Sequence, residues 1–215
     1  IYNGFNFQIV STENGLTHNY VNCITGGNSD TIFVGTKGGI DVFIGNQHAS
    51  FNPSFFNKAN SNEVNCILPF KNYLLIGTSK GMFILNGKHV LLLTKMDGLP
   101  GDHFKDFEVL NQTKIILATL DGGLIELEIE PAIKITNRIQ ALSINCIKKI
   151  NQQLYLGTAN QGTWVVRGDS IFALKSAQID LANSSIFDII NYKDKIALAT
   201  FGKGTYYIEE KGLIQ

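Results

Sequence analysis

The sequence repeats itself about every 41 residues, and this period limits the possible folds more than any other feature. Each copy holds a short apolar run, a small residue followed by threonine, and then one or two glycines, as in Ile76-Gly77-Thr78 with Gly81. Five threonines mark the copies with spacings of 42, 41, 39 and 42 residues: Thr36, Thr78, Thr119, Thr158 and Thr200. Such regularity indicates supersecondary units that stack on one another.

Three further short segments recur in each period at nearly constant distances from the threonine. In the second copy, an apolar segment at residues 64–67 precedes it, another at 82–85 follows the glycine, and a weaker one lies at 89–94. Four short strands in a period of this length are typical of a β-propeller blade. We therefore predict an all-β protein, a single β-propeller domain over residues 1–215 with five recognisable four-stranded blades.

The residues that recur in the hairpin between the second and third strands have structural explanations. A glycine or alanine before the threonine suits a place where neighbouring sheets approach closely. The threonine hydroxyl can bond the nearby backbone, and the glycine after it can adopt a positive φ that closes the hairpin. We interpret all three residues as structural.

The composition of the chain excludes several classes of protein. The 215 residues are 44% hydrophobic and only 17% charged, which excludes a disordered, self-repelling chain. Eighteen basic residues balance eighteen acidic ones without a long basic cluster, so no nucleic-acid partner is predicted. The longest apolar run is residues 90–93, so no membrane segment is predicted. The sequence does not begin with an initiator methionine, and its first residues do not resemble a signal sequence. We expect a mature form or an excised region.

The repeats resemble those of the two-component regulator propeller family. Residues 14–24 combine Asn-Gly-Leu-Thr with Val-Asn-Cys-Ile, which is similar to the usual opening of such a domain, and residues 96–100 repeat the lead-in as Met-Asp-Gly-Leu-Pro. The resemblance covers nearly the whole chain. It departs from the family pattern at five positions where tryptophan is frequent, namely Phe33, Leu75, Ile116, Tyr155 and Ala197.

The resemblance implies the extracytoplasmic, often periplasmic, sensor region of a histidine kinase, frequently a hybrid kinase whose output domains lie far downstream. It also implies that several members sense oligosaccharides and that others serve secretion or surface assembly. No kinase motif is present in these residues, so this region is predicted not to be an enzyme.

The blade count leaves two alternatives open. Residues 5–10 precede Gly-Leu as residues 90–94 do and match a fourth strand, while residues 208–215 also enter a fourth strand. Either the chain is five blades of a larger propeller, or it is a compact five-bladed ring with an added tail. An open sheet edge needs a partner, which favours the first alternative.

Neither a metal site nor a catalytic group stands apart from the repeat. Cys23, Cys66 and Cys146 share one repeat position that Asp106 and Asp188 hold in the other blades, which predicts small core residues rather than a disulfide or metal site. Asp106 and Asp188 are expected to form structural hydrogen bonds. Asp41 and Asp121 are interpreted as ordinary turn residues, and the histidines lack ligand spacing. No cofactor is predicted.

The predicted function is non-catalytic ligand sensing or binding. Its ligand is expected to contact the lead-in loops and the hairpins after the second strands: His18, Asn19, Tyr20, Lys37, Lys80, His103, Lys105, Asp121, Asn160, Gln161, Phe201 and Lys203. Candidate partners are an oligosaccharide or other small ligand, a second copy, or a further propeller domain. The alternatives are a structural or protein-interaction propeller and a lectin-like five-bladed ring with one sugar site per blade.

Overall fold

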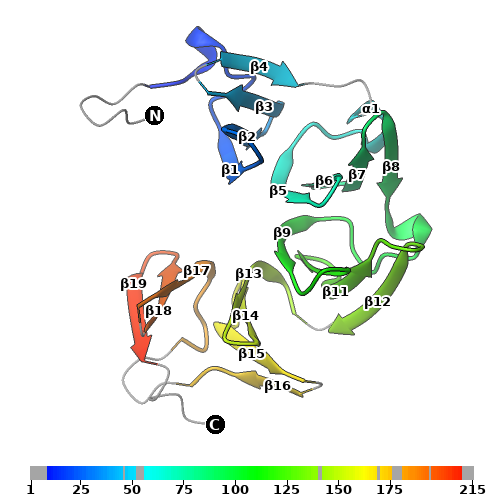
Figure 1. The fold of residues 1–215 in the computed structure, drawn as a ribbon. Helices are drawn as coiled ribbons and strands as arrows, with labels where there is room; N and C mark the ends of the chain where they lie inside the picture. Colours follow the sequence, from blue (N-terminus) through cyan, green and yellow to red (C-terminus); the bar gives the residue numbers. More distant parts are fainter. Residues whose placement is uncertain are drawn as a thin grey trace. The chain divides into compact units, whose positions relative to one another are not determined.

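The computed structural model describes residues 9–45, 47–51, 56–139, 142–168, 170–175, 181–193 and 195–209. In these ranges the chain forms five antiparallel sheets, drawn in sequence order from blue to red in Figure 1. Each sheet is a meander in which strands consecutive in sequence are also neighbours in space. The predicted all-β propeller class with five blades is confirmed.

The chain divides into two compact units, Ile1–Leu93 and Thr94–Gln215. The first contains blades 1 and 2, and its elements in order are η1 (Thr12–Asn14), β1 (Val21–Gly26), β2 (Thr31–Thr36), β3 (Gly39–Ile44), β4 (Gln47–Phe51), α1 (Phe56–Ala59), β5 (Val64–Phe70), β6 (Tyr73–Thr78), β7 (Gly81–Asn86) and β8 (His89–Leu93).

The second unit contains blades 3 to 5. Its elements in order are η2 (Lys95–Asp97), β9 (Phe104–Val109), β10 (Lys114–Thr119), β11 (Gly123–Glu128), β12 (Lys134–Ile139), β13 (Ile144–Ile150), β14 (Gln153–Thr158), β15 (Thr163–Arg167), β16 (Ser170–Ala173), β17 (Ile186–Tyr192), β18 (Lys195–Thr200) and β19 (Gly204–Glu209). Blade 5 thus shows three strands in the described range. The strands expected at residues 5–10 and 208–215 fall largely outside the described residues.

The repeated threonine closes the hairpin between the second and third strands. In all five blades its hydroxyl donates to the carbonyl of the glycine at the start of the third strand or, in blade 4, just before it, over 2.7 to 3.1 Å. In blades 1 to 4 the same oxygen also accepts a backbone N–H from within the turn. The closing glycines have positive φ: Gly39, Gly81, Gly123, Gly162 and Gly204. The predicted hairpin chemistry is confirmed.

Thr78→Val is expected to lower the free energy of unfolding by about 2 kcal/mol, because valine has the same shape as the fully buried Thr78 but removes its hydrogen bonds to the Gly81 carbonyl and the Lys80 N–H. Thr200→Val is the matched control, since Thr200 is partly exposed and water can replace its bond to Gly204. Urea denaturation of both variants measures the difference. Equal losses in the two would contradict the role of burial.

Neighbouring blades within each unit bury apolar side chains between their sheets. Ile40 of blade 1 packs with Val64 and Ile67 of blade 2 in one cluster. In the second unit, one cluster joins blades 3 and 4 around Ile116 and Ile144, and another joins blades 4 and 5. Because both faces of such a sheet are covered, its strands are apolar runs rather than strict alternations.

In blades 1 and 4 the small residue before the threonine lies where the next blade of the same unit comes close. A Cβ built on Gly35 would lie 2.7 Å from Val64 Cγ1, and one on Gly157 would lie 2.8 Å from Ile186 Cγ2. Glycine stands opposite cysteine on the first strand in blades 1, 2 and 4, whereas alanine stands opposite aspartate in blades 3 and 5. The cysteine sulfur therefore fills the space that the alanine methyl takes in the other blades.

One short helix was not predicted. Helix α1 lies between blades 1 and 2, where Phe56 and Ala59 are buried and the Phe56 ring meets the Phe83 ring edge-on, with centroids 5.5 Å apart. Four residues are too few to show a helical period in the sequence, and tertiary packing stabilises the turn. Among the described residues, no helix is long and apolar enough to cross a membrane.

Candidate functional site

A backbone hydrogen bond joins the lead-in loop of a blade to its hairpin. The residue after the repeated threonine donates its N–H to the carbonyl just before the first strand, over 2.9 to 3.1 Å. The four bonds run from Lys37 to Tyr20, Leu120 to His103, Ala159 to Ser143, and Phe201 to Ser185. The loops and hairpins that sequence reasoning selected are therefore neighbours at one edge of each of these blades.

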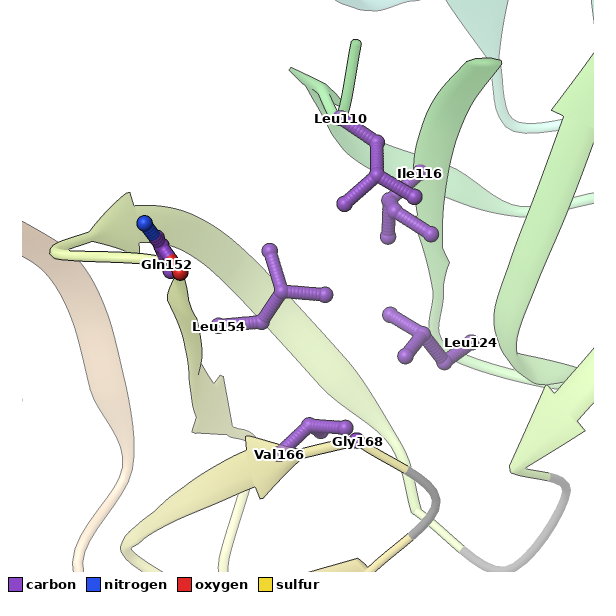
Figure 2. A pocket seen from close by; sticks show the side chains of 7 residues that line it. All are labelled: Leu110, Ile116, Leu124, Gln152, Leu154, Val166 and Gly168. Atoms are coloured by element: carbon purple, nitrogen blue, oxygen red, sulfur yellow. The ribbon is translucent and has the colours of Figure 1, made fainter.

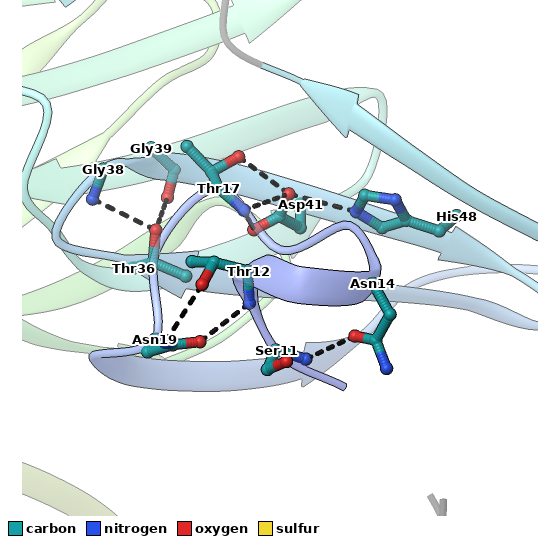
Figure 3. A network of polar contacts seen from close by, with 10 residues as sticks. All are labelled: Ser11, Thr12, Asn14, Thr17, Asn19, Thr36, Gly38, Gly39, Asp41 and His48. Atoms are coloured by element: carbon teal, nitrogen blue, oxygen red, sulfur yellow. Dashed lines mark hydrogen bonds and ion pairs between the residues drawn. The ribbon is translucent and has the colours of Figure 1, made fainter. Parts of the chain in front are cut away.

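The lead-in loop of blade 1 is held in place by a buried carboxylate (Figure 3). Asp41 on β3 is fully buried, and it accepts hydrogen bonds from the Thr17 N–H at 3.0 Å and the Thr17 hydroxyl at 2.8 Å. The His48 Nε2 lies 3.1 Å from the same carboxylate. Asp41 is thus an anchor of the loop rather than an ordinary turn residue, and that interpretation was wrong.

A sequence signal for Asp41 exists in the comparison of blades. The strand register places it at the position of Phe83, Ile125, Trp164 and Tyr206 in the other four blades. A carboxylate at a position that holds large, mainly apolar residues in the other four blades indicates a specific polar contact in blade 1. Here that contact fixes the loop that carries His18, Asn19 and Tyr20.

His18, Tyr20 and Lys37 form an exposed group at this edge of blade 1. The Lys37 Nζ lies 4.1 Å from the centroid of the Tyr20 ring, and the Tyr20 N–H donates to His18 Nδ1 over 2.9 Å. Asn19 belongs to the frame of the loop, because its side chain bonds the Thr12 N–H at 2.8 Å (Figure 3). The group offers an aromatic face, a cation and an imidazole from a restrained backbone.

The lead-in loop of blade 3 has the same local structure. In both loops a capping box begins the 3₁₀ helix, through Ser11 and Asn14 in blade 1 and Thr94 and Asp97 in blade 3. Asp102 accepts the Lys95 N–H at 2.7 Å as Asn19 accepts that of Thr12. The loops are equivalent as expected, but this register places His103 opposite Tyr20 and not opposite His18.

Asp121 is engaged inside the blade 3 loop. It accepts the His103 N–H at 3.0 Å and the Lys95 Nζ at 2.6 Å, and the Asp102 N–H at 3.3 Å. Partial burial acts to raise the pKa of Asp121, but these hydrogen bonds and the Lys95 charge outweigh it and hold the pKa below its usual value. The same hydrogen bond and charge raise the pKa of Lys95. Asp121 positions the loop through this pair.

The remaining predicted residues are distributed over the same edges. Gln161 accepts the Trp164 Nε1–H on its carbonyl at 3.0 Å, and Lys203 donates to the Ser184 hydroxyl at 3.1 Å. Phe201 is 75% exposed, with its ring centroid 5.9 Å from that of Phe187. Lys80 and Asn160 are exposed and Lys105 is partly buried. Their ligand role stays a prediction.

The first-strand carboxylates and thiols are structural. Burial raises the pKa of Asp106 to about 7, and hydrogen bonds from the Ile147 and Phe107 N–H groups only partly oppose it. Burial and the nearby Asp106 and Asp188 raise the pKa of the Cys146 thiol well above its usual value, which keeps it protonated and unreactive. All three cysteines are free, as predicted, although Cys23 is only partly buried. The described residues contain no cluster of metal-ligating side chains.

A hollow of about 280 Å³ lies between blades 3 and 4, away from the predicted residues (Figure 2). Its lining is formed by Leu110, Ile116, Leu124, Gln152, Leu154, Val166 and Gly168. Gln152 alone among these carries a polar side chain, so the hollow offers little to orient a polar ligand. Sequence reasoning did not select it, because its walls are apolar strand residues of two sheets together with the turn residues Gln152 and Gly168.

No protein-family model matches the sequence, and no curated protein matches it. Among solved structures, the chain is similar to the extracellular domain of BT3049 of B. thetaiotaomicron, described as a hybrid two-component system. The TM-score is 0.73 and the identity 17%, over 98% of this chain and 29% of that one. The extracellular domain of BT4673 from the same organism, also described as a hybrid two-component system, is similar with a TM-score of 0.71 and 16% identity, over 91% of this chain and 27% of that one.

PorZ, a bacterial surface component of the type-IX secretion system of Porphyromonas gingivalis, is similar with a TM-score of 0.64 and 15% identity, over 92% of this chain and 33% of PorZ. The chain therefore spans about a third or less of each of these three structures. At these identities the likeness is one of fold: the chain has the β-propeller fold found in extracellular domains of two-component systems.

Proposed function

We propose that this propeller is a non-catalytic, extracytoplasmic ligand-sensing domain of the two-component type. The observation that carries the proposal is the group of His18, Tyr20 and Lys37, exposed on a loop that the buried Asp41 anchors. A side-chain group on a restrained backbone loses little conformational freedom when a ligand binds, which favours affinity. The fold shared with extracellular domains of hybrid two-component systems supports the same reading.

An oligosaccharide fits the chemistry of this group. The Tyr20 ring is 57% exposed, so its flat face is available to the C–H face of a sugar ring. Lys37 donates hydrogen bonds, and among the described residues His18 Nε2 has no partner, so the pair can recognise sugar hydroxyls. Signal output would then follow from tighter binding of the ligand to one packing arrangement of the full-length protein than to another.

Tyr20→Ala is expected to weaken oligosaccharide binding at least tenfold, because it removes both the stacking face and the ring beneath Lys37. Titration calorimetry against a panel of oligosaccharides measures this, after the panel has identified a ligand for the unmodified chain. Tyr192→Ala is the matched control, since Tyr192 is also exposed and lies beneath a lysine, with Lys193 Nζ 5.3 Å from its ring centroid. Equal weakening by both variants, or none by Tyr20→Ala, would reject this site.

The binding stoichiometry separates this proposal from a lectin-like ring. A lectin of this kind repeats one sugar site in every blade, whereas the exposed group of blade 1 does not recur in blade 3, where the aromatic ring between His103 and Lys105 belongs to the completely buried Phe104. We therefore expect one ligand per chain in the calorimetric titration. Several equivalent sites would favour the lectin alternative.

A structural or protein-interaction role is the second candidate. Blade 5 exposes the large side chains of Phe187, Ile190, Tyr192 and Tyr207, which is unusual for a surface with no partner. The fold similarity to PorZ, a surface component of a secretion system, is compatible with such a role.

A further inference from the structure

The hollow between blades 3 and 4 is lined at its floor by buried side chains from both sheets (Figure 2). Ile116 and Leu124 of blade 3 are each 1% exposed, and Leu154 of blade 4 is 8% exposed. All three belong to the apolar cluster that joins these two blades. Because both blades lie in the unit Thr94–Gln215, the hollow is a feature of one compact unit.

Turns of the two blades form the mouth of the hollow. Leu110 follows β9, Gln152 lies in the turn between β13 and β14, and Gly168 lies in the turn between β15 and β16. Because the strands of a meander alternate in direction, these turns stand at the end of each sheet opposite to the lead-in loops. The hollow is therefore at the other edge of the blades from the one that carries the predicted ligand-binding residues.

The interface between blades 4 and 5 shows what fills the equivalent space elsewhere. Ile116 stands three residues before the repeated threonine of blade 3, and Tyr155 stands three residues before that of blade 4. The Tyr155 ring is completely buried in the cluster that joins blades 4 and 5, and its hydroxyl donates to Gln153 Oε1 over 3.3 Å. In blade 1 the same position carries Phe33, which packs in the cluster between blades 1 and 2. An aromatic ring thus fills this position in both of these interfaces.

The facing wall differs little between the two interfaces of the second unit. Leu154 and Val166 pair across β14 and β15, and Ile196 and Ile208 hold the same places across β18 and β19. The two pairs are aliphatic and differ by one methylene group. The largest difference is therefore the phenol ring of blade 4, which an isoleucine side chain replaces in blade 3. We attribute the hollow to the space of this absent ring.

We propose that the hollow binds a small, uncharged aromatic compound, whose ring takes the space that the Tyr155 ring fills in the next interface. The volume of about 280 Å³ is sufficient, since an apolar protein cavity of roughly 150 Å³ accommodates benzene. The aliphatic lining disfavours a charged ligand, which would lose its hydration without gaining a partner. An apolar ring restores the van der Waals contacts that an unfilled space between sheets lacks.

A phenol is the class of compound expected to bind best. Gln152 at the mouth carries an amide that can hydrogen-bond a ring hydroxyl, as Gln153 does for the hydroxyl of Tyr155. With apolar walls and a single polar group at one end, the hollow orients such a ligand with its ring inward and its hydroxyl outward. This site does not depend on the proposed oligosaccharide site.

The probe is para-cresol, which is the side chain of tyrosine as a free molecule. We expect its titration to shift the backbone amide NMR signals of Leu110, Leu154 and Val166 in a saturable way, with one site per chain. Toluene lacks the hydroxyl and is expected to shift the same signals with a dissociation constant about fivefold higher. Gln152→Leu should abolish this difference between the two compounds. A difference that persists in Gln152→Leu would reject Gln152 as the group that recognises the hydroxyl.

Two variants fill the hollow from its opposite walls. Ile116→Phe returns a ring to the wall of blade 3 and is expected to weaken para-cresol binding at least tenfold. It should also raise the midpoint of urea denaturation, because a filled hollow regains contacts. Val166→Phe acts from blade 4, where the partly exposed side chain leaves room for the larger residue, so the test stands even if Ile116→Phe does not fold. Ile32→Phe is the control, since Ile32 on blade 1 is 40% exposed and should leave binding unchanged.

A titration with no saturable shift up to the solubility limit of para-cresol would overturn the proposal. Shifts confined to residues outside blades 3 and 4 would do the same, because they place the ligand elsewhere. So would unweakened binding by whichever of the two filling variants folds. Tyr20→Ala leaves the hollow intact and should bind para-cresol as the unmodified chain does, which keeps this result distinct from the test of the oligosaccharide site.

Discussion

Gly157→Val is expected to lower the free energy of unfolding by about 3 kcal/mol or more, the largest loss among the single substitutions considered. Gly157 lies on β14 where blades 4 and 5 come closest, and its Cβ would meet the Cys146 sulfur and lie 2.8 Å from Ile186 Cγ2. Ile186 is completely buried and has no room to move away. Overpacking a close contact of this kind forces side chains from their preferred rotamers and separates the sheets. Urea denaturation monitored by circular dichroism gives the value.

Ala199→Val is the control for this prediction. Ala199 holds the equivalent position in blade 5, pairs with Asp188, and is partly exposed. The added methyl groups therefore meet solvent, and the change is expected to stay within about 0.5 kcal/mol. Comparable losses at both positions would show that the strand, and not the approach of the next blade, requires a small residue.

Asp106 is expected to make the protein less stable as the pH rises from about 4 to about 7. Its pKa is about 7 in the folded chain and returns to the ordinary value near 4 on unfolding, so the folded state binds this proton more tightly. The stabilisation is complete below the unfolded pKa and is lost as the pH rises through the folded pKa. The full loss attributable to Asp106 is about 4 kcal/mol.

Comparison with Asp106→Asn isolates this contribution. The asparagine cannot ionise, so the difference in unfolding free energy between the unmodified chain and the variant should shift in favour of the variant between pH 4.5 and pH 8. Every other titrating group contributes to both proteins and largely cancels in the difference. Urea denaturation at several pH values measures both curves. Parallel curves would show that Asp106 ionises in the folded state as readily as in the unfolded chain.

The period and the hairpin chemistry could be predicted because they are local. The repeated threonine with its small neighbour and glycine acts within one turn, through a hydroxyl bond and a positive φ that any copy of the hairpin needs. The four strands of each period could be predicted as well, because their segments recur at nearly constant distances from that threonine. Two exchanges were also visible in the sequence, aspartate for cysteine on the first strand and alanine for glycine before the threonine, although the packing that links them was not.

Asp41 and the offset between the two histidines could not be predicted from local pattern. Asp41 follows a glycine turn, where aspartate is common, and it stands out only when the blades are compared, because the strand register places it on β3 at a position that is apolar in most blades. His18 and His103 occupy equivalent loops, yet the equivalence of Asn19 with Asp102 makes His103 the counterpart of Tyr20, two positions after His18. Both facts depend on which backbone groups are paired.

The sequence by itself determined the all-β class, the length of each blade and the small residues and hairpins that build it, because these depend on contacts within about forty residues. Only the tertiary structure decided which polar side chains serve the frame and which face solvent. Asp41 and Asp121 anchor loops, Asp106 bridges two blades, and Asp188 at the same repeat position bonds the N–H of Ile189 in its own strand. Identical residues differ in role because the next blade supplies the partner, and that neighbour lies some forty residues away in sequence.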